Sequence, residues 1–213
     1  ALTSNTTGHS NVAVGIYALD ANTTGNNNTG IGLHALGANT TGIQNVAIGN
    51  NCMAANTDSV DNVAVGHLAL QANTTGDEQV AIGKNALNDN TTGASNTAVG
   101  KDALDGNTTG SYNTCIGKMS GRHITTGGQN VTLGYYSGND EGVGTVFHIT
   151  TESYRCVMGS KQTTNFYCKV GLTTTSDERD KMNFEEIPHG LSFVNDLNPI
   201  KYKFKKSRED ATP

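Results

Sequence analysis

The sequence predicts a mainly β protein: a parallel β-roll, or β-solenoid, of eight 17-residue coils, then a β-stranded neck, then the beginning of a small α/β domain. Three observations predict this order. Two short blocks recur at a constant interval through residues 1–135. Most Tyr and Phe residues lie after residue 134, which favours a different architecture for residues 136–175. The last segment, residues 176–213, shares neither pattern.

The repeats have a strict period. The block Asn-Thr-Thr-Gly begins at Asn5 and returns, with degenerate forms, at a 17-residue interval until Ile124. A second block, Asn-Val-Ala-Val-Gly at Asn11, returns at the same interval until Asn130. A fixed period without insertions indicates a solenoid with one coil per period. Equivalent Asn and Thr residues would then stack about 4.8 Å apart and form hydrogen-bonded ladders.

The second block predicts the strand of each coil. Large residues such as Val12 and Val14 alternate with a small residue such as Ala13, and a Gly follows in all eight coils. Alternation places the large residues on one face of a strand and the small residue on the other. The recurring Ala18-Leu19 pair would form the opposing wall of a narrow interior. We therefore expect the large residues inside and the small position at the contact between chains.

Association with identical chains is expected because each coil is poor in large apolar residues. About three large aliphatic side chains per coil bury too little surface to order a whole coil within one chain. Ladder hydrogen bonds supply part of the missing stabilisation. Burial against further copies is the simplest source of the rest.

The repeat resembles a known motif. The blocks from Asn11 to Gly15 and from Asn45 to Gly49 resemble the coil motif in the head domains of YadA-type trimeric autotransporter adhesins. The resemblance covers about residues 1–135 and implies a left-handed parallel β-roll assembled as a homotrimer. The 17-residue period is longer than the usual coil of those heads.

Other readings of the repeat are less favoured. Asn-Thr-Thr is a glycosylation sequon, but a sugar on successive coils would crowd a ladder. Ice-binding solenoids need spaced Thr ranks on one face, whereas adjacent Thr residues here would point opposite ways. A period of 17 does not fit the hexapeptide acyltransferase roll, and no regular Asp rank suits calcium.

Composition argues against cofactors, nucleic acid and membrane insertion. The cysteines lack CxxC spacing and regular His neighbours, so we expect buried small residues and neither a metal site nor a cofactor. Residues 1–142 carry four Lys and Arg against ten Asp and Glu, which gives no basic stripe for nucleic acid. No apolar run is long enough to cross a membrane. The cysteines are Cys52, Cys115, Cys156 and Cys168.

Residues 136–175 are expected to form the neck. Short β-branched and aromatic runs at Thr145 to Ile149, Tyr154 to Met158 and Asn165 to Val170 are separated by Gly, Ser and Thr. This pattern suits short strands in an intertwined stalk. The lone His148 is expected to be structural.

Residues 176–213 begin a different domain. Leu191, Val194 and Leu197 recur at helical spacing after Pro188, which favours a helix. An alternating apolar and Lys pattern from Ile200 then predicts a half-buried strand.

The segment from Thr173 to Phe204 resembles the start of the C-terminal intramolecular chaperone domain of phage tailspikes and tail fibres, the type known from endosialidases. The shared pattern is Ser-Asp-x-Arg-x-Lys, a Gly-Leu helix and a Leu-x-Pro-x-x-Tyr strand. In that family the domain helps three chains assemble and is released by self-cleavage just before the Ser. The family's domain is longer than the segment from Ser176 to Pro213.

The resemblance implies a cleavage site in this chain. The cleaved bond would join Thr175 to Ser176, with Ser176 and Lys181 as the catalytic pair and Asp177 and Arg179 in support. A partly desolvated lysine can accept the proton that makes a serine hydroxyl nucleophilic. The alternative is that Ser176 caps a short helix and Lys181 is solvated.

The favoured function is that of a structural component of a trimeric phage tail fibre or spike, which acts in host-cell attachment. The partner would be a host cell-surface receptor, with a glycan as one candidate, and the protein would lie in the virion after assembly in the host cytoplasm. No external catalytic activity is expected, at most single-turnover Ser-Lys autoproteolysis. A bacterial trimeric surface adhesin is the alternative.

A glycan-degrading tailspike enzyme is a further alternative. It would need paired carboxylates in a groove. Six aspartates of the repeats fall in different repeat positions and form no recurring pair; they are Asp20, Asp58, Asp61, Asp77, Asp89 and Asp102.

Overall fold

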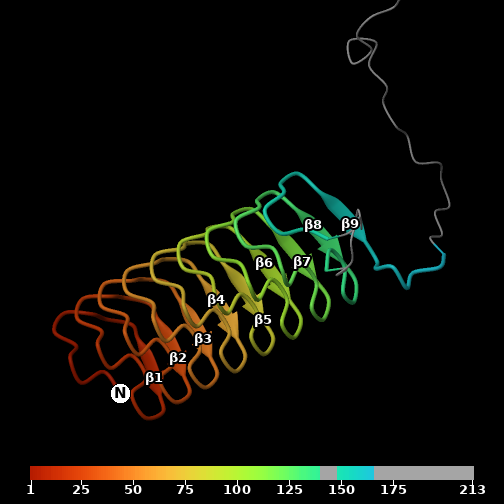
Figure 1. Ribbon diagram of the computed structural model, residues 1–213. Coiled ribbons are helices and arrows are strands. Elements are labelled where there is room, and N and C mark those ends of the chain that lie inside the picture. The colour runs from red at the N-terminus through yellow and green to blue at the C-terminus, as the bar shows by residue number, and fades with distance from the viewer. Residues whose placement is uncertain (140–147, 166–213) are drawn as a thin grey trace, which may run out of the picture. The chain divides into compact units, whose positions relative to one another are not determined.

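A single parallel sheet runs the length of the repeats (Figure 1). The computed structural model describes residues 1–139 and 148–165. Each strand has three residues and pairs with the strand of the next coil, in sequence order. The strands are β1 (Val12–Val14), β2 (Thr29–Ile31), β3 (Val46–Ile48), β4 (Val63–Val65), β5 (Val80–Ile82), β6 (Thr97–Val99), β7 (Thr114–Ile116), β8 (Val131–Leu133) and β9 (Cys156–Met158).

The register of the sheet follows the repeat. Ala64 of β4 lies opposite Ala47 of β3 and Ala81 of β5, so each residue pairs with its equivalent in the adjacent coil. Both the parallel solenoid and the position of its strand are therefore confirmed.

Glycine closes the strand because successive coils approach closely there. Gly15 has a φ of 125°, and a Cβ added to it would lie 2.6 Å from the carbonyl oxygen of Gly32. A side chain at this position would collide with the backbone of the next coil. This explains why a Gly follows the strand in all eight predicted coils.

The wall opposite the strand, which contains Ala18 and Leu19 in the first coil, includes a sharp turn of the backbone. Tyr17 and Leu19 adopt left-handed φ angles of 59° and 49°. Between them the chain bends enough that two consecutive residues, Ala18 and Leu19, are both fully buried. Equivalent residues repeat this turn along the stack, which lines the interior with a rank of Leu and Met side chains.

The orientation of the strand is the reverse of the one expected. Ala47, Ala64 and Ala81 are completely buried, while Val14, a large residue of strand β1, is 56% exposed. The interior is too narrow for the expected arrangement, since a Cβ on Gly30 would lie only 3.3 Å from Cγ of Leu19. The small position therefore faces the core, and the prediction that it contacts another chain is wrong.

Two ladders of buried amides run beside this apolar core. In the first, Nδ2 of Asn39 donates to Oδ1 of Asn22 at 2.9 Å, and Nδ2 of Asn107 donates to Oδ1 of Asn90 at 2.7 Å. In the second, Nδ2 of Asn62 donates to Oδ1 of Asn45 at 2.9 Å. Because these amides are buried, each bond replaces hydration that the side chain has lost. The predicted Asn ladders are present, but inside the coils.

The solenoid extends beyond the eight expected coils. Strand β9 continues the same sheet, and the strand expected at Tyr154 to Met158 is thus found over Cys156–Met158, within the solenoid. Equivalent positions of these last two coils are 25 apart in the sequence instead of 17, so this coil carries an eight-residue insertion. Asn139 and His148 pair through an isolated antiparallel bridge on either side of residues 140–147.

Candidate self-association face

The outward side of the sheet is an uncharged surface that we call the outer face. It consists of the first and third residues of every strand, because the middle residue points into the core. The first rank is Val12, Thr29, Val46, Val63, Val80, Thr97, Thr114, Val131 and Cys156, and the second rank is Val14, Ile31, Ile48, Val65, Ile82, Val99, Ile116, Leu133 and Met158.

The second rank of the outer face leaves much apolar surface uncovered. Val14 is 56% exposed, Ile82 40%, Ile116 43% and Met158 53%. With strands about 4.8 Å apart, the nine strands form a continuous stripe of roughly 40 Å. Contiguous apolar surface of this extent marks interaction sites in soluble proteins. This face was not predicted from the sequence, although the lack of charged residues at both strand positions is a visible signal.

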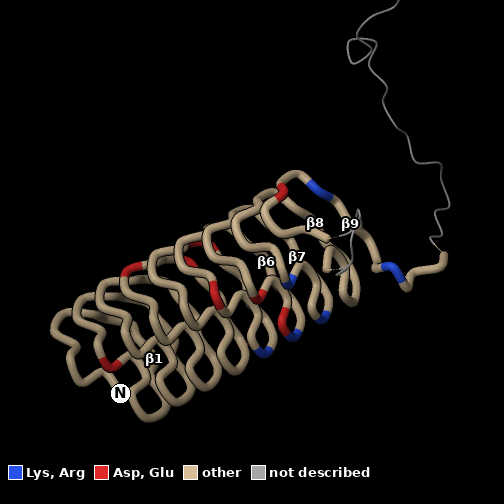
Figure 2. Tube along the Cα trace, viewed as in Figure 1, with Lys and Arg blue, Asp and Glu red and all other residues tan. Residues whose placement is uncertain are grey.

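The two long edges of the outer face differ in charge. The edge that precedes the strands carries Asp61 and Glu78, and we call it the acidic edge. The edge that follows the strands carries Lys84, Lys101 and Lys118, and we call it the basic edge. Figure 2 shows the Lys residues as a row along one corner of the coils, with few charges on the first coils.

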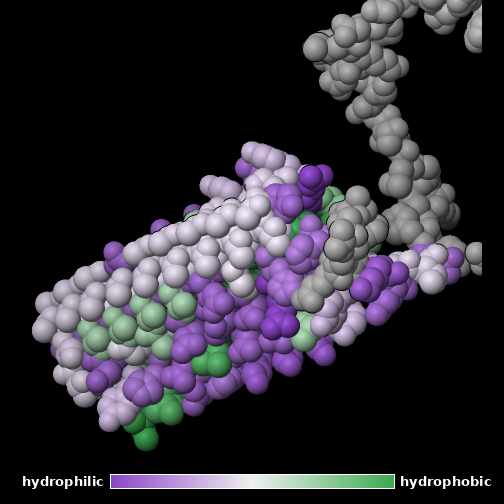
Figure 3. Space-filling view, viewed as in Figure 1, coloured by the Kyte–Doolittle hydropathy of each residue, from purple (hydrophilic) through white to green (hydrophobic). Residues whose placement is uncertain are grey.

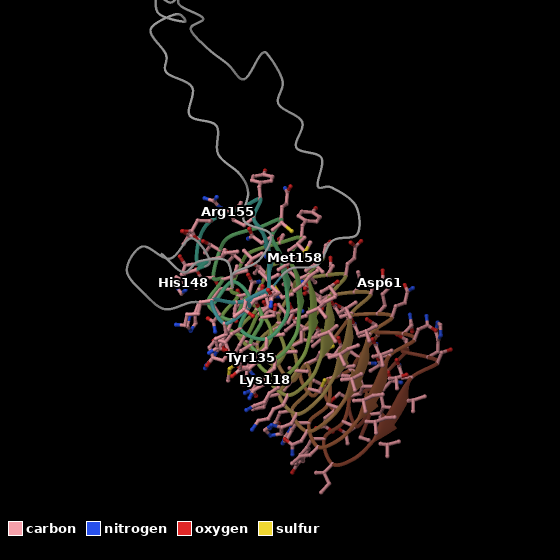
Figure 4. All side chains as sticks on the ribbon, turned by 90° about the vertical axis from the view of Figure 1, so that its right-hand side faces the viewer. Asp61, Lys118, Tyr135, His148, Arg155 and Met158 are labelled. Carbon is pink, nitrogen blue, oxygen red and sulfur yellow. The ribbon has the colours of Figure 1, made fainter. Side chains whose placement is uncertain are left out.

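Local contacts orient several of these charged side chains. Oε2 of Glu78 accepts a hydrogen bond from Oγ of Ser95 at 2.8 Å. The Lys118 ammonium lies 5.6 Å from the ring centroid of Tyr135, a cation–π contact. In Figure 4, Lys118 and Tyr135 lie together, and Asp61 lies well apart from them. Asp61 and Lys118 thus lie on different borders of the sheet, while on the basic edge Nζ of Lys101 lies 3.4 Å from Oδ2 of Asp102.

One side of the surface is seen in Figure 3. In the view of Figure 3, strongly hydrophobic residues occupy only small areas, while most of the visible surface is near neutral or hydrophilic. Thr ladders contribute here: Oγ1 of Thr23 donates to the carbonyl oxygen of Thr40 at 3.0 Å.

The glycosylation sequons lie mostly inside the fold. Asn22, Asn39 and Asn90 are fully buried in the first ladder. Their amide nitrogens already donate to neighbouring Asn and Gly oxygens, as Asn90 does to Gly93 at 3.0 Å. An enzyme could not reach these amides in the folded solenoid, so this surface carries no row of glycosylated Asn at those coils.

The three cysteines among the described residues divide into two kinds, and Cys168 lies outside those residues. Cys52 and Cys115 are buried and free, and burial raises the pKa of each thiol to about 12. Cys156 is exposed at the end of the outer face, which corrects the expectation that it is buried. Within the described parts of the chain, no group of three or more His, Cys, Asp or Glu side chains could hold a metal ion.

Asp105, which lies outside the outer face, has a perturbed pKa. Burial raises the pKa of Asp105, and the nearby negative charge of Asp89 raises it further, while Arg122 lowers it. Nε of Arg122 lies 3.5 Å from Oδ2 of Asp105, one coil away. We interpret this contact as an ion pair that joins successive coils. The 17-residue spacing of the two residues was a signal for it.

The predicted cleavage site lies outside the described residues. This applies to the bond between Thr175 and Ser176, to Lys181, and to the supporting Asp177 and Arg179. The expected helix after Pro188 and the strand from Ile200 also lie there, as does the neck strand expected from Asn165 to Val170, apart from its first residue. These expectations stay predictions.

The structure bears on membrane insertion in one respect. Among residues 1–139 and 148–165 it contains no helix with the length and hydrophobicity needed to span a bilayer.

Comparison with known proteins gives a family match for the C-terminal segment. Residues 176–213 match the peptidase S74 family, described as the chaperone of endosialidase. This match supports the predicted beginning of an intramolecular chaperone domain. Neither a curated protein nor a solved structure matches the chain at a significant level.

Proposed function

We propose that this chain is part of a trimeric phage tail fibre or spike that acts in attachment to the host cell. The observation that carries the proposal is the combination of a solenoid with an uncovered apolar outer face and a following chaperone-of-endosialidase segment. Covering the outer face with identical chains would supply the burial that a single chain lacks. The virion is its proposed location, after assembly in the host cytoplasm.

The partner outside the particle is proposed to be a host cell-surface receptor, with a glycan as one candidate. The polar surfaces away from the outer face would remain available for such contact after association. The chaperone segment would direct assembly of three chains and then be released, which leaves the solenoid as the finished part.

Release is proposed to occur by self-cleavage between Thr175 and Ser176. Lys181 would accept the proton of the Ser176 hydroxyl as the oxygen attacks the preceding carbonyl carbon. As the ester between Thr175 and the Ser176 oxygen forms, the C–N bond between the two residues breaks and the amine of Ser176 takes up the proton. Water then hydrolyses the ester, which leaves one chain with a carboxylate at Thr175 and another that begins at Ser176. Assembly is expected to precede cleavage, because the two side chains need a fixed orientation and a partly dry environment.

The test uses a protein that carries the complete chaperone domain. Light scattering should give the mass of three chains, and intact-mass measurement should give a chain that ends at Thr175. Ser176→Ala and Lys181→Ala should each give an uncleaved trimer. Ser176→Asn is the matched control, since Asn is an equally good helix N-cap but lacks the nucleophile. If Ser176→Asn is cut like the wild type, Ser176 is not the nucleophile.

A bacterial trimeric surface adhesin is a second candidate. It is favoured by the likeness of the Asn11 to Gly15 block to the YadA-type coil motif. The full-length gene product decides between the two, because an adhesin would continue into a membrane anchor, whereas a tail fibre would continue into a complete chaperone domain.

A further inference from the structure

Two histidines of the last coils lie side by side. His123 and His148 are 25 residues apart, the distance that separates equivalent positions of the last two coils, and each precedes a buried Ile, Ile124 or Ile149. His148, a lone histidine in the sequence, thus has a partner in the structure. We infer that the pair binds one divalent transition-metal ion, and that zinc fits it best. Both ligands come from one chain, so the inference does not depend on self-association.

The backbone holds the two histidines in adjacent coils. The backbone amide of Thr125, two residues after His123, donates to the carbonyl oxygen of Thr150 at 2.7 Å. On its other side, His148 pairs with Asn139 through the antiparallel bridge. Equivalent residues of hydrogen-bonded parallel segments lie about 4.8 Å apart. The two imidazoles therefore project from neighbouring positions whose spacing is fixed by the fold.

The spacing of the two rings suits a tetrahedral ion. Their centroids lie 5.4 Å apart, and their planes make an angle of 64°. With zinc–nitrogen bonds of about 2.05 Å and ring nitrogens about 1.2 Å from the centroid, two imidazoles at the tetrahedral angle have centroids about 5.3 Å apart. Ligands at a right angle, as in octahedral or square-planar sites, would bring the centroids to about 4.6 Å. The observed spacing favours zinc, which is tetrahedral in most protein sites.

The pair also contains a buried atom that lacks a partner. Nδ1 of His148 is buried and makes no hydrogen bond to the described residues. Leaving a buried polar atom unpaired is unfavourable, and a neutral imidazole nitrogen is a common zinc ligand. Coordination would satisfy this atom, so we assign Nδ1 as the ligand atom of His148.

The charges near the pair are compatible with a bound cation. Arg122 directly precedes His123, but its Nε lies 3.5 Å from Oδ2 of Asp105, which offsets its charge. Asp89 occupies the position equivalent to His123 two coils earlier and adds a negative charge on the same rank. Two protein ligands leave the other positions of a four-coordinate ion to water. The site is therefore smaller than a group of three protein ligands, and such a group is absent from the described residues.

Zinc titration tests the site. The parent is the full chain with Cys156→Ser and Cys168→Ser, since an exposed thiol would compete for zinc. Isothermal titration calorimetry with zinc chloride should show one bound ion per chain that depends on the pair. His123→Gln and His148→Gln should each weaken its binding roughly tenfold or more, whereas His67→Gln, at an exposed position of an early coil, should leave it unchanged. No zinc binding by the parent, or equal affinity in all three variants, would overturn the inference.

Chemical labelling tests the same site without a substitution in the pair. Diethyl pyrocarbonate modifies unligated imidazole nitrogens, and mass spectrometry locates the modified histidines. Saturating zinc should protect His123 and His148 in the parent chain and leave the labelling of His67 unchanged. Equal labelling of the pair with and without zinc would overturn the inference, even if the Gln variants failed to fold.

Thermal unfolding gives a third readout. An ion that binds only the folded protein stabilises it, so zinc should raise the unfolding temperature of the parent and of His67→Gln. It should not raise that of His123→Gln or His148→Gln. A rise of equal size in all of these proteins would place the ion elsewhere and overturn the inference.

Discussion

The first six coils and the two that follow them fill the same interior space with different residues. The early coils place a large residue such as Leu87 on the turning wall and an Asn such as Asn90 at the start of the next block. In the late coils Gly121 takes the first position and Ile124 the second. A Cβ on Gly121 would lie 3.1 Å from Cδ1 of Ile124 and about as close to Thr132, so the space that Leu leaves is filled from the adjacent block and from across the interior.

The buried polar contacts also differ between these two groups of coils. Where the Asn ladder stops, Oγ of Ser120 donates to the carbonyl oxygen of Thr132 at 2.9 Å, and Oγ of Ser137 donates to that of Val157 at 2.8 Å. Asn107, the last amide of the first ladder, has a buried Oδ1 without a partner. The comparison shows two requirements of the interior: its volume must be filled by side chains, and its buried polar groups must be hydrogen-bonded. Residues of neighbouring coils meet both requirements together.

Leu87→Gly should have the largest effect. It removes a fully buried side chain while Asn90, unlike Ile124, cannot fill the space. We expect a loss of roughly 3–5 kcal/mol in the free energy of unfolding, measured by denaturant titration. Leu87→Met is the control and should cost less than about 1.5 kcal/mol, since Met53 occupies the equivalent position. Equal losses would show that filling this position is not what matters.

Substitutions of Ile124 test the packing of the late coils. Ile124→Ala should cost roughly 2–5 kcal/mol because it opens a cavity beside Gly121. Ile124→Asn should cost about 1 kcal/mol less than the Ala variant, since its Nδ2 can donate to the unpaired Oδ1 of Asn107. If the Ile124→Asn variant is less stable than the Ile124→Ala variant in thermal or chemical unfolding, an Asn at this position does not extend the first Asn ladder by one coil.

Combining exchanges should reveal coupling between coils. Asn90→Ile alone removes the donor to Oδ1 of Asn73, at 2.8 Å, and the acceptor of Asn107. In a double-mutant cycle, Leu87→Gly/Asn90→Ile should be about 1–2 kcal/mol more stable than the sum of its parts, because Ile can enter the space that Leu leaves. Additive losses would mean that the early coils cannot adopt the packing of the late ones.

The smallest expected effect is a difference in alkylation rate between buried and exposed thiols. Cys52 belongs to the early coils and Cys115 to the late ones, and in the native protein both should resist alkylation at pH 8 more strongly than Cys156, as read by mass spectrometry. Their folded-state pKa of about 12 exceeds the ordinary value of 9.0, so stabilisation by the neutral thiols is complete below pH 9 and is lost as pH rises toward 12. Rapid labelling of Cys115 alone would indicate local opening of the late coils.

Much of the fold was predictable because a strict period determines register. The strand at Val63–Val65 and its pairing with β5 follow directly from the 17-residue spacing. The sidedness of that strand was not predictable, because Val63 and Ala64 are both apolar and alternation alone does not say which faces the core. The width of the interior decides it, and this width depends on the Leu70 rank across the coil.

The ninth coil escaped prediction for a different reason. Residues 149–151, Ile-Thr-Thr, repeat residues 124–126, but an eight-residue insertion breaks the period and hid the match. The candidate interface was likewise missed because its large residues had been assigned to the interior. By contrast, the resemblance of the C-terminal segment to a chaperone domain was visible in the sequence, and the family match at residues 176–213 agrees with it, while the role of Ser176 stays a prediction.

The amide ladders also have a direction. Nδ2 of every Asn from Asn22 to Asn107 in the first ladder donates toward the preceding coil, whereas hydroxyls such as that of Thr23 donate toward the following one. A 17-residue unit drawn from this region offers its two neighbours the same donors and acceptors as any other. Genetic duplication or deletion of whole units can therefore lengthen or shorten the solenoid in steps of about 4.8 Å while both of its ends keep their contacts.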